Sequence, residues 1–214
     1  MGEKKLKKAY IYTGGESYGA LLPIPPCDAL IIAADSGYDL ADGCGVIPSL
    51  LVGDMDSIES KYIPDTVEII KVKAEKDETD TMLAVDLALS RGAEEIYIFG
   101  GLGGRVDHGL SNIYLLEYIH SRGAVGYISD GKNCVRYLRN GSMKIHCDSY
   151  KYFSLISLDA VSYGVTVDGG KYPLCGAELR RERQYAVSNE FLSETDDVTV
   201  NVENGTLLVI THHC

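Results

Sequence analysis

The sequence predicts an α/β fold, with an N-terminal, open and mostly parallel α/β sheet domain followed by an all-β, sandwich-like C-terminal domain. Up to about residue 130, short apolar runs alternate with segments of helical length, which is typical of strand–helix–strand units. Beyond that point the apolar runs are short and separated by turn signals, and none is of helical length. We therefore predict one domain over residues 1–130 and a second over residues 131–214.

The apolar runs of the first domain predict parallel strands buried on both faces, because several are continuous rather than alternating. They span residues 9–12, 29–34, 50–52, 67–72, 96–99 and 125–128. Thr79 can cap a helix over residues 79–90, with Asp80 in its first turn, and a second helix is expected over about residues 107–121. These elements predict an open sheet with right-handed crossovers.

Short strands separated by turns are expected in the second domain. They span residues 134–138, 143–147, 152–158, 161–167, 198–202 and 207–211. Asn140-Gly141 and Asn204-Gly205 lie between successive strands, and this dipeptide favours two-residue hairpin turns. The pattern predicts antiparallel pairing in a sandwich or barrel.

Composition excludes several classes of partner. The 214 residues contain 20 Lys and Arg against 31 Asp and Glu, a net charge of −11. Nucleic acids and anionic membranes are poor partners for such a chain, since their binding rests on concentrated positive charge. The six cysteines form no C-x-x-C pair, and no apolar stretch has the length of a signal-peptide core or membrane helix. We expect a cytoplasmic protein with reduced thiols.

Two pairs of aspartates lie at expected strand–helix junctions. Asp54 and Asp56 follow the strand over residues 50–52, at the carboxyl end where open α/β sheets bind ligands. In an extended chain they would face the same way roughly 6.6 Å apart. Asp77 and Asp80 begin the helix over residues 79–90. The alternative for each pair is capping of a turn or helix, but two pairs together favour a shared site for Mg²⁺, which prefers oxygen ligands.

A glycine-rich loop follows the expected strand over residues 96–99. Four glycines between positions 100 and 104 precede Arg105, so backbone N–H groups can approach an anion at a helix N-terminus. The loop is neither a G-x-G-x-x-G fingerprint nor a Walker A loop. The forked guanidinium of Arg105 suits phosphate oxygens, whereas the alternative is a tight turn whose arginine pairs with an acid. Beside the carboxylates, the loop predicts a metal–phosphate site.

Six motifs give the chain a resemblance to the thiamine pyrophosphokinases, and to their bacterial branch most. The resemblance covers roughly residues 9–212 and rests on motifs in the family's order: Asp35-Ser36-Gly37, Gly53-Asp54-Met55-Asp56-Ser57, Glu75-Lys76-Asp77-Glu78-Thr79-Asp80-Thr81, Gly101-Leu102-Gly103-Gly104-Arg105-Val106-Asp107-His108, Gly170-Lys171-Tyr172-Pro173-Leu174 and Val187-Ser188-Asn189-Glu190. Tyr172 stands where some relatives carry Trp. The resemblance implies transfer of pyrophosphate from ATP to thiamine, which gives thiamine diphosphate and AMP, with Mg²⁺ and in a homodimer.

The resemblance also implies roles for individual residues. Four residues match acidic metal and phosphate-site positions of the family: Asp54, Asp56, Asp77 and Asp80. The nucleotide side is matched by Asp35, Ser36, Gly37, Gly103, Gly104, Arg105 and His108, with Asp107 in the glycine-loop motif. Tyr172, Ser188 and Asn189 fall where the β domain helps to form the thiamine pocket across the dimer interface. Asp107 and the metal-site aspartates are all candidates to accept the proton of the thiamine hydroxyl.

Two rival functions remain at this point. A metal-dependent glycosyltransferase would use Asp54 and Asp56 as its D-x-D pair, but it would give no role to Asp77, Asp80 or the glycine loop. A non-catalytic binding or sensor protein would keep the fold after losing a metal carboxylate, and none of the four is missing.

Overall fold

The computed structural model describes residues 7–59, 62–72, 77–147, 150–193 and 197–213. The chain divides into two compact units, Met1–Gly131 and Lys132–Cys214. The first contains β1 (Lys8–Tyr12), the 3-10 helix η1 (Gly19–Leu21), β2 (Leu30–Ala34), α1 (Gly37–Gly43), β3 (Leu50–Gly53), β4 (Glu68–Lys71), α2 (Asp80–Ser90), β5 (Glu95–Phe99), α3 (Val106–Ser121) and β6 (Val125–Ser129). The second contains β7 (Asn133–Ile145), β8 (Tyr152–Ser157), β9 (Val161–Asp168), β10 (Leu174–Arg180), β11 (Asn189–Glu190) and β12 (Val198–His212).

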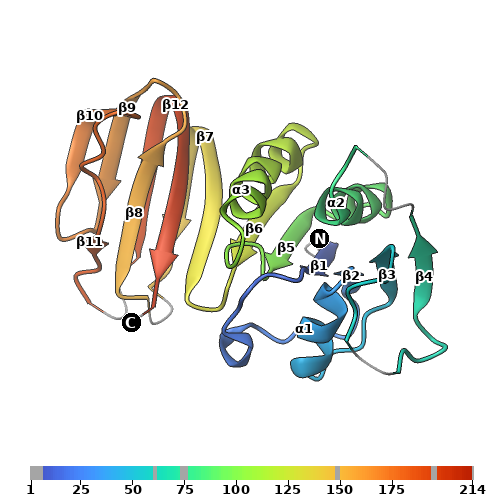
Figure 1. Ribbon diagram of the computed structural model, residues 1–214. Helices are drawn as coiled ribbons and strands as arrows, with labels where there is room; N and C mark the ends of the chain where they lie inside the picture. The colour runs from blue at the N-terminus through green and yellow to red at the C-terminus, as the bar shows by residue number, and fades with distance from the viewer. Residues whose placement is uncertain (1–6, 60–61, 73–76, 148–149, 194–196, 214) are drawn as a thin grey trace, which may run out of the picture. The chain divides into compact units, whose positions relative to one another are not determined.

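The first unit is built on a parallel sheet with the order β6-β5-β1-β2-β3-β4. Helices α2 and α3 lie together on one face and α1 lies on the other (Figure 1). The strand order reverses at β1, because the chain passes from β4 back to β5 on the opposite side. Such a switch point opens a crevice at the carboxyl ends of the strands. The predicted α/β class is confirmed.

Helix α2 begins where its sequence signal predicts. Thr79 is the N-cap residue and its hydroxyl accepts a hydrogen bond from the Met82 N–H at 3.2 Å, which satisfies one of the unpaired donors of the first turn. Buried Ala84, Val85 and Ala88 form its inner face. Small inner residues let the helix lie close to the sheet, so the position of its first turn is fixed by packing as well as by the cap.

The second unit is antiparallel, as the turn-rich sequence predicts, but its two longest strands were predicted wrongly. Strands β7 and β12 each run through an Asn-Gly pair that the sequence predicts to be a hairpin turn. The two pairs lie opposite each other, where the register shifts between Val202 and Thr206, and the Gly205 N–H donates to Asn140 Oδ1 at 2.8 Å. Asn140 and Gly205 both have positive φ, at 44° and 133°. Each Asn-Gly pair therefore forms part of a bulge that bends a continuous strand.

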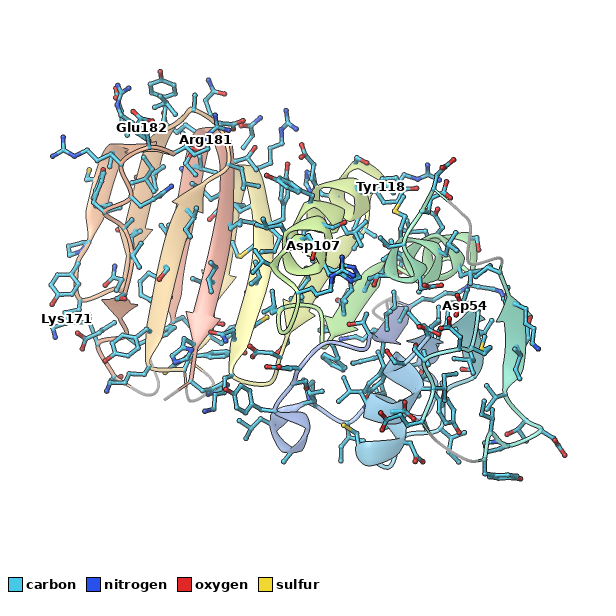
Figure 2. The ribbon with its side chains drawn as sticks, viewed as in Figure 1. Asp54, Asp107, Tyr118, Lys171, Arg181 and Glu182 are labelled. Atoms are coloured by element: carbon cyan, nitrogen blue, oxygen red, sulfur yellow. The ribbon has the colours of Figure 1, made fainter. Side chains whose placement is uncertain are left out.

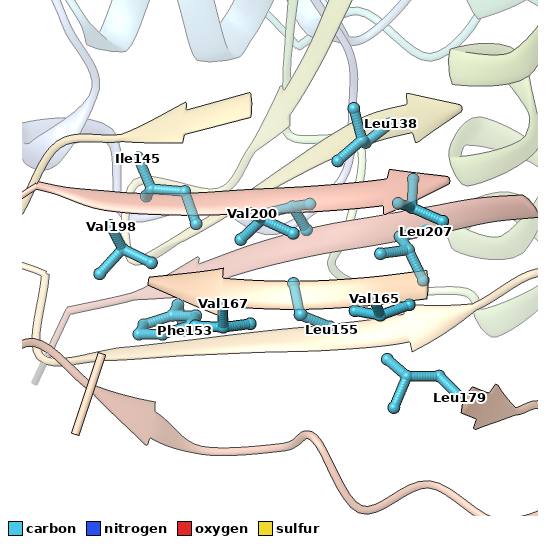
Figure 3. Packing of buried hydrophobic residues seen from close by; sticks show 12 residues of the cluster. Leu138, Ile145, Phe153, Leu155, Val165, Val167, Leu179, Val198, Val200 and Leu207 are labelled. Carbon is cyan, nitrogen blue, oxygen red and sulfur yellow. The ribbon is translucent and has the colours of Figure 1, made fainter. Parts of the chain in front are cut away.

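This bend lets one strand serve two parts of the β unit. Strand β12 pairs with β7 along its length, with β9 through its first half and with β8 through its second half. The buried side chains of both halves join one core, shown in Figure 3, which comprises Leu138, Ile145, Phe153, Leu155, Val165, Val167, Leu179, Val198, Val200, Val202, Leu207 and Val209. Strands that change partners at a bulge are a usual way to close a sandwich-like fold.

Among the residues that the structure describes, no helix combines the length and apolar character that a bilayer crossing requires.

Candidate active site

A pocket of about 530 Å³ opens at the carboxyl edge of the parallel sheet, beside the switch point at β1. Its lining is contributed by the loops after β1, β2 and β5 and by the first turns of α2 and α3. It comprises Thr13, Gly14, Gly15, Glu16, Ala34, Asp35, Ser36, Thr79, Asp80, Thr81, Gly100, Gly103, Gly104, Arg105, His108 and Asn112. Two helix N-termini thus face one pocket, and both favour bound negative charge.

Glycines let the three loops approach one another closely. A Cβ at Gly15 would collide with the carbonyl oxygen of Gly100, and a Cβ at Gly37 would collide with that of Tyr12. A Cβ at Gly103 would lie 2.5 Å from the carbonyl oxygen of Glu16, closer than real Cβ atoms come. The loops after β1, β2 and β5 are therefore packed backbone to backbone. The glycines of these loops expose peptide groups to the pocket that they line.

Two side chains hold the glycine loop in place. The amide of buried Asn112 donates from Nδ2 to the Gly101 carbonyl at 3.0 Å, and the Thr13 hydroxyl donates to the Phe99 carbonyl at 3.0 Å. Sequence reasoning did not select Thr13, Glu16 or Asn112. Thr13-Gly14-Gly15 directly follows a strand, so the signal for this loop was visible in the sequence. Asn112 carried no such signal, because it lies inside a helix.

Arg105 lies at the mouth of the pocket and forms a two-pronged ion pair with Asp107. Its Nε and Nη2 atoms donate to the two Asp107 oxygens at 3.1 and 2.6 Å, and the His108 N–H donates to Oδ1 at 3.0 Å. The hydrogen bonds and charge of Arg105 lower the pKa of Asp107 to about 2. The Asp107 carboxyl is therefore a weak base in this arrangement, and it fixes the direction of the guanidinium.

The predicted Asp54–Asp56 pair comes together, but by a turn rather than by an extended chain. Met55 between them has a φ of 71°, and Asp54 Oδ1 accepts a hydrogen bond from the Asp56 N–H at 3.2 Å. The expectation of two side chains along an extended segment was thus wrong in its geometry. Figure 2 labels Asp54 at the end of β3. The hydrogen bond shared with the Asp54 carboxyl, followed by its like charge, raises the pKa of Asp56.

Asp35 joins these two carboxylates from the neighbouring strand. One ligand oxygen each from Asp35, Asp54 and Asp56 lies within 4.8 Å of the others. Asp35 has a left-handed backbone with a φ of 50°, and its Oδ2 accepts a hydrogen bond from the Ser57 hydroxyl. Its Oδ1 is buried and has no hydrogen-bond partner among the described residues. Three converging carboxylates with an unpartnered buried oxygen suit a hard divalent cation.

The second predicted acid pair separates. Asp80 lies in the first turn of α2 and lines the pocket with Asp35, whereas Asp77 is exposed and is not among the lining residues. Neither belongs to the cluster of Asp35, Asp54 and Asp56. Glu75 and Lys76 of the same motif lie outside the described residues. Most of the predicted nucleotide-side residues line the pocket, namely Asp35, Ser36, Gly103, Gly104, Arg105 and His108. Gly37 instead allows the start of α1 to lie close to the end of β1.

The second unit contains a smaller, more apolar pocket of about 250 Å³, which holds Tyr172 and Asn189. Phe153, Leu155, Val167, Leu174, Tyr185, Ala186 and Val187 complete its lining. Buried Asn189 grips the backbone of Tyr172, because its Oδ1 accepts from the Tyr172 N–H at 3.0 Å and its Nδ2 donates to the Tyr172 carbonyl at 2.7 Å. Tyr172 remains 56% exposed, and the Lys171 Nζ atom lies over its ring, 5.5 Å from the ring centre.

Ser188 has a structural place beside this pocket. Its backbone is left-handed, with a φ of 58°, and its N–H donates to Ser154 Oγ at 3.0 Å. It is not among the lining residues. Its neighbours in the chain, Val187 and Asn189, do line the pocket. Tyr185 was not selected from the sequence, and Val187 was named only as part of the motif Val187-Ser188-Asn189-Glu190.

Comparisons with known proteins agree across both units. Residues 27–125 match the family model "Thiamin pyrophosphokinase, catalytic domain", and residues 142–207 match "Thiamin pyrophosphokinase, vitamin B1 binding domain". The thiamine pyrophosphokinase of Bacillus subtilis is 33% identical over 186 residues, which cover 85% of this chain and 86% of that protein.

Solved structures give the same result. The crystal structure of the Bacillus subtilis thiamine pyrophosphokinase aligns with a TM-score of 0.85 at 29% identity and covers 97% of this chain and 100% of that one. The crystal structure of the Geobacillus thermodenitrificans thiamin pyrophosphokinase aligns with a TM-score of 0.83 at 27% identity, over 97% and 98% of the two chains. Sequence, both domain models and fold thus converge, and the chain belongs to the thiamin pyrophosphokinase family.

Proposed function

We propose that this chain performs the reaction for which its family is named: it transfers the pyrophosphoryl group of ATP to the hydroxyl of thiamine, giving thiamine diphosphate and AMP. The observation that carries the proposal, beyond membership of the family, is the pocket at the switch point. Peptide groups, two helix N-termini and Arg105 form one part of it, and Asp35 and Asp80 line another part. Asp35 also belongs to the acidic cluster, whose other members, Asp54 and Asp56, lie outside the lining. A glycosyltransferase would leave Arg105 and the glycine loop without a role.

The triphosphate would bind along the glycine loop and the helix N-termini. The loops there are packed backbone to backbone, so their N–H groups are fixed before the ligand arrives. Donors that are already in position stabilise the charge of the transition state without reorganisation. Arg105 would bind phosphate oxygens with the guanidinium edge that its pair with Asp107 leaves available. Phosphoryl transfer depends mainly on such positioning and charge compensation.

The acidic cluster of Asp35, Asp54 and Asp56 is our proposed site for Mg²⁺, with Asp80 facing the same pocket as Asp35. This set differs from the one that the sequence predicts, since it adds Asp35 and leaves Asp77 outside both the cluster and the pocket lining. Mg²⁺ bound there would compensate the negative charge of the phosphate oxygens. In a chain of net charge −11, anionic ATP requires such local positive charge.

The alcohol proton of thiamine needs a carboxylate acceptor, and the structure argues against Asp107 in that role. Both Asp107 oxygens are engaged by Arg105, and the pKa of Asp107 is lowered to about 2. A base with so low a pKa gives little driving force for proton transfer near neutral pH. We therefore assign Asp107 to holding Arg105, and the metal-site aspartates remain our candidates for the proton acceptor.

The apolar pocket of the second unit is our proposed contact for thiamine. Thiamine carries a positive charge on an aromatic ring, and the ring of Tyr172 can bind it by stacking and by cation–π attraction, in place of the Lys171 ammonium that lies over the ring. Asn189 fixes the backbone that presents this ring. We expect the chain to act as a cytoplasmic homodimer, in which this pocket contributes to a site across the subunit interface.

Product analysis tests the proposal directly. The protein is incubated with ATP, Mg²⁺ and thiamine, and the nucleotide product is separated by anion-exchange chromatography. We expect AMP and thiamine diphosphate in equal amounts, with both formed at least about 100-fold more slowly by an Asp54→Asn variant. ADP with thiamine monophosphate would show a simple kinase, and ATP consumption that does not depend on thiamine would refute the proposal.

A further inference from the structure

An ion pair lies beside the apolar pocket of the second unit. The Lys171 ammonium donates to Glu190 Oε1 at 2.9 Å, and its Nζ atom lies over the Tyr172 ring, 5.5 Å from the ring centre. Tyr172 lines the pocket, whereas Lys171 and Glu190 do not. Figure 2 labels Lys171 near β11. A lysine ammonium thus occupies the aromatic surface that the pocket would offer to a cationic ligand.

The backbone holds these three side chains near one another. The Lys171 N–H donates to the Glu190 carbonyl at 2.9 Å. The Oδ1 atom of buried Asn189 accepts from both the Tyr172 N–H, at 3.0 Å, and the Glu190 N–H, at 2.9 Å. The ammonium, the carboxylate and the ring are therefore presented by two segments that hydrogen bonds join, so their proximity does not depend on exposed side chains alone.

We propose that Lys171 and Glu190 make the pocket selective for the positive charge of thiamine, an inference that rests on the proposed function. Before thiamine binds, the Lys171 ammonium lies over Tyr172 and is neutralised by Glu190. The thiamine cation displaces this ammonium from the ring, and the Glu190 carboxylate becomes its counter-ion. A neutral ligand gains neither cation–π attraction nor an ion pair, so it does not offset the displacement of Lys171.

The exposure of the ion pair allows this exchange. The side chains of Lys171 and Glu190 are 48% and 32% exposed, and ion pairs of this kind contribute little to stability. A lysine side chain is a point charge on a flexible stem, so the ammonium can leave the ring and be hydrated in solvent. The backbone of Tyr172 stays in place, because Asn189 binds both its N–H and its carbonyl. The ammonium can therefore yield to a ligand without any change in the strands.

Three variants separate the two charges. Lys171→Met removes the ammonium charge and keeps a side chain of similar length, Lys171→Arg keeps a positive charge, and the double variant Lys171→Met/Glu190→Gln also removes the carboxylate charge. The matched control is Arg180→Met, which breaks a similar ion pair. Arg180 Nη2 donates to Glu178 Oε2 at 2.9 Å, and neither residue lines the apolar pocket. Circular dichroism melting curves establish that each variant is folded.

The test measures, by isothermal titration calorimetry on the full chain, binding of thiamine and of its neutral isostere, in which a thiophene ring replaces the thiazolium. Lys171→Met should lower the Kd for thiamine about fivefold and change that for the isostere less than about twofold. The double variant should bind thiamine about threefold more weakly than Lys171→Met, because the counter-ion is lost. Lys171→Arg should bind thiamine no more tightly than the wild type, and Arg180→Met should match the wild type.

Three outcomes would overturn the inference and leave the proposed function standing. The first is a Lys171→Met variant that binds thiamine no more tightly than the wild type. The second is an equal gain for thiamine and for the neutral isostere, since removal of a steric obstacle would act on both alike. The third is a double variant that binds thiamine as Lys171→Met does, which would leave Glu190 without its role. Failure of the wild type to bind thiamine, with no AMP formed from ATP and thiamine, would instead refute the proposed function itself.

Discussion

The polar pocket of the α/β unit and the aromatic pocket of the β unit are built in different ways. Backbone at strand ends and helix starts forms much of the first, where glycines allow the loops to touch. Side chains of strands and of the segment before β11 form the second. The first should therefore tolerate almost no added atoms in its loops, whereas the second should tolerate exchange of side chains with graded effects. The following predictions test this contrast.

The largest effect is expected at the acidic cluster. Asp54→Asn removes one of three converging carboxylate charges without changing the size of the side chain. We expect turnover to fall at least about 100-fold, as for loss of one fixed electrostatic group in an active site. The melting temperature should stay nearly unchanged, because the substitution removes repulsion between like charges and does not disrupt the core. Formation of AMP measures turnover, and Asp65→Asn, at an exposed residue outside the pocket, is the control.

A single methyl group in the glycine framework should have the next largest effect. The Cβ in Gly37→Ala would collide with the carbonyl group of Tyr12. We expect the free energy of unfolding to drop by about 2–3 kcal/mol, the upper part of the range for overpacking. Gly43→Ala in the same helix meets no atom within 4 Å and should be slightly stabilising. Urea denaturation compares the two, and equal stability would contradict backbone-to-backbone packing.

The aromatic pocket should respond in a graded way. Tyr172→Ala removes the ring but leaves the backbone that Asn189 holds. We expect the KM for thiamine to rise about tenfold, since cation–π contacts contribute about 0.5–2 kcal/mol, with little change in the KM for ATP. Tyr172→Trp should lower the KM for thiamine, because Trp is the stronger cation–π partner. Tyr163→Ala, at an exposed tyrosine outside the pocket, should leave both constants unchanged.

The smallest effect concerns the pH dependence of Asp107. Arg105 lowers the pKa of Asp107 to about 2, below its usual value of about 3.9. A lowered pKa in the folded state gives stability that is fully present above about pH 4 and is lost as pH falls toward 2. Both side chains are well exposed, so the contribution should be small and should decrease with salt.

NMR titration of the Asp107 carboxyl checks this prediction. In an Arg105→Gln variant, its pKa should return toward the usual value. An unchanged pKa in that variant would contradict the assignment of Arg105 as its cause, and with it the argument against Asp107 as the proton acceptor.

Local signals in the sequence were sufficient for much of the first unit. Thr79 and the apolar residues after it define α2, because a capping hydroxyl and a buried face act within a few turns of chain. The parallel strands followed from continuous apolar runs. The Asp54 motif was placed correctly at a strand end, but its turn was missed, since nothing in Asp54-Met55-Asp56 requires Met55 to be left-handed.

Long-range pairing limited the prediction of the second unit. Asn140-Gly141 and Asn204-Gly205 are turn signals in isolation, and they became opposed bulges because β7 and β12 pair across both of them. Strand β10 was missed altogether, since only Leu179 is buried along it and its apolar pattern is weak. Here the energy of pairing with a neighbouring strand outweighs the local preference of the residues.

By itself the sequence determined the two-unit α/β and β organisation, the family and several of the segments that line the two pockets. Those features depend on apolar periodicity, caps and motifs, which act over short stretches of chain. Only the tertiary structure decided that Asp35 joins Asp54 and Asp56 while Asp77 lies apart, and that Asp107 is bound to Arg105. It also decided that Tyr12 lines a second pocket of the first unit. Such contacts depend on the order of strands in the sheet and on close packing of the loops. Both are determined jointly by residues that lie far apart in the chain.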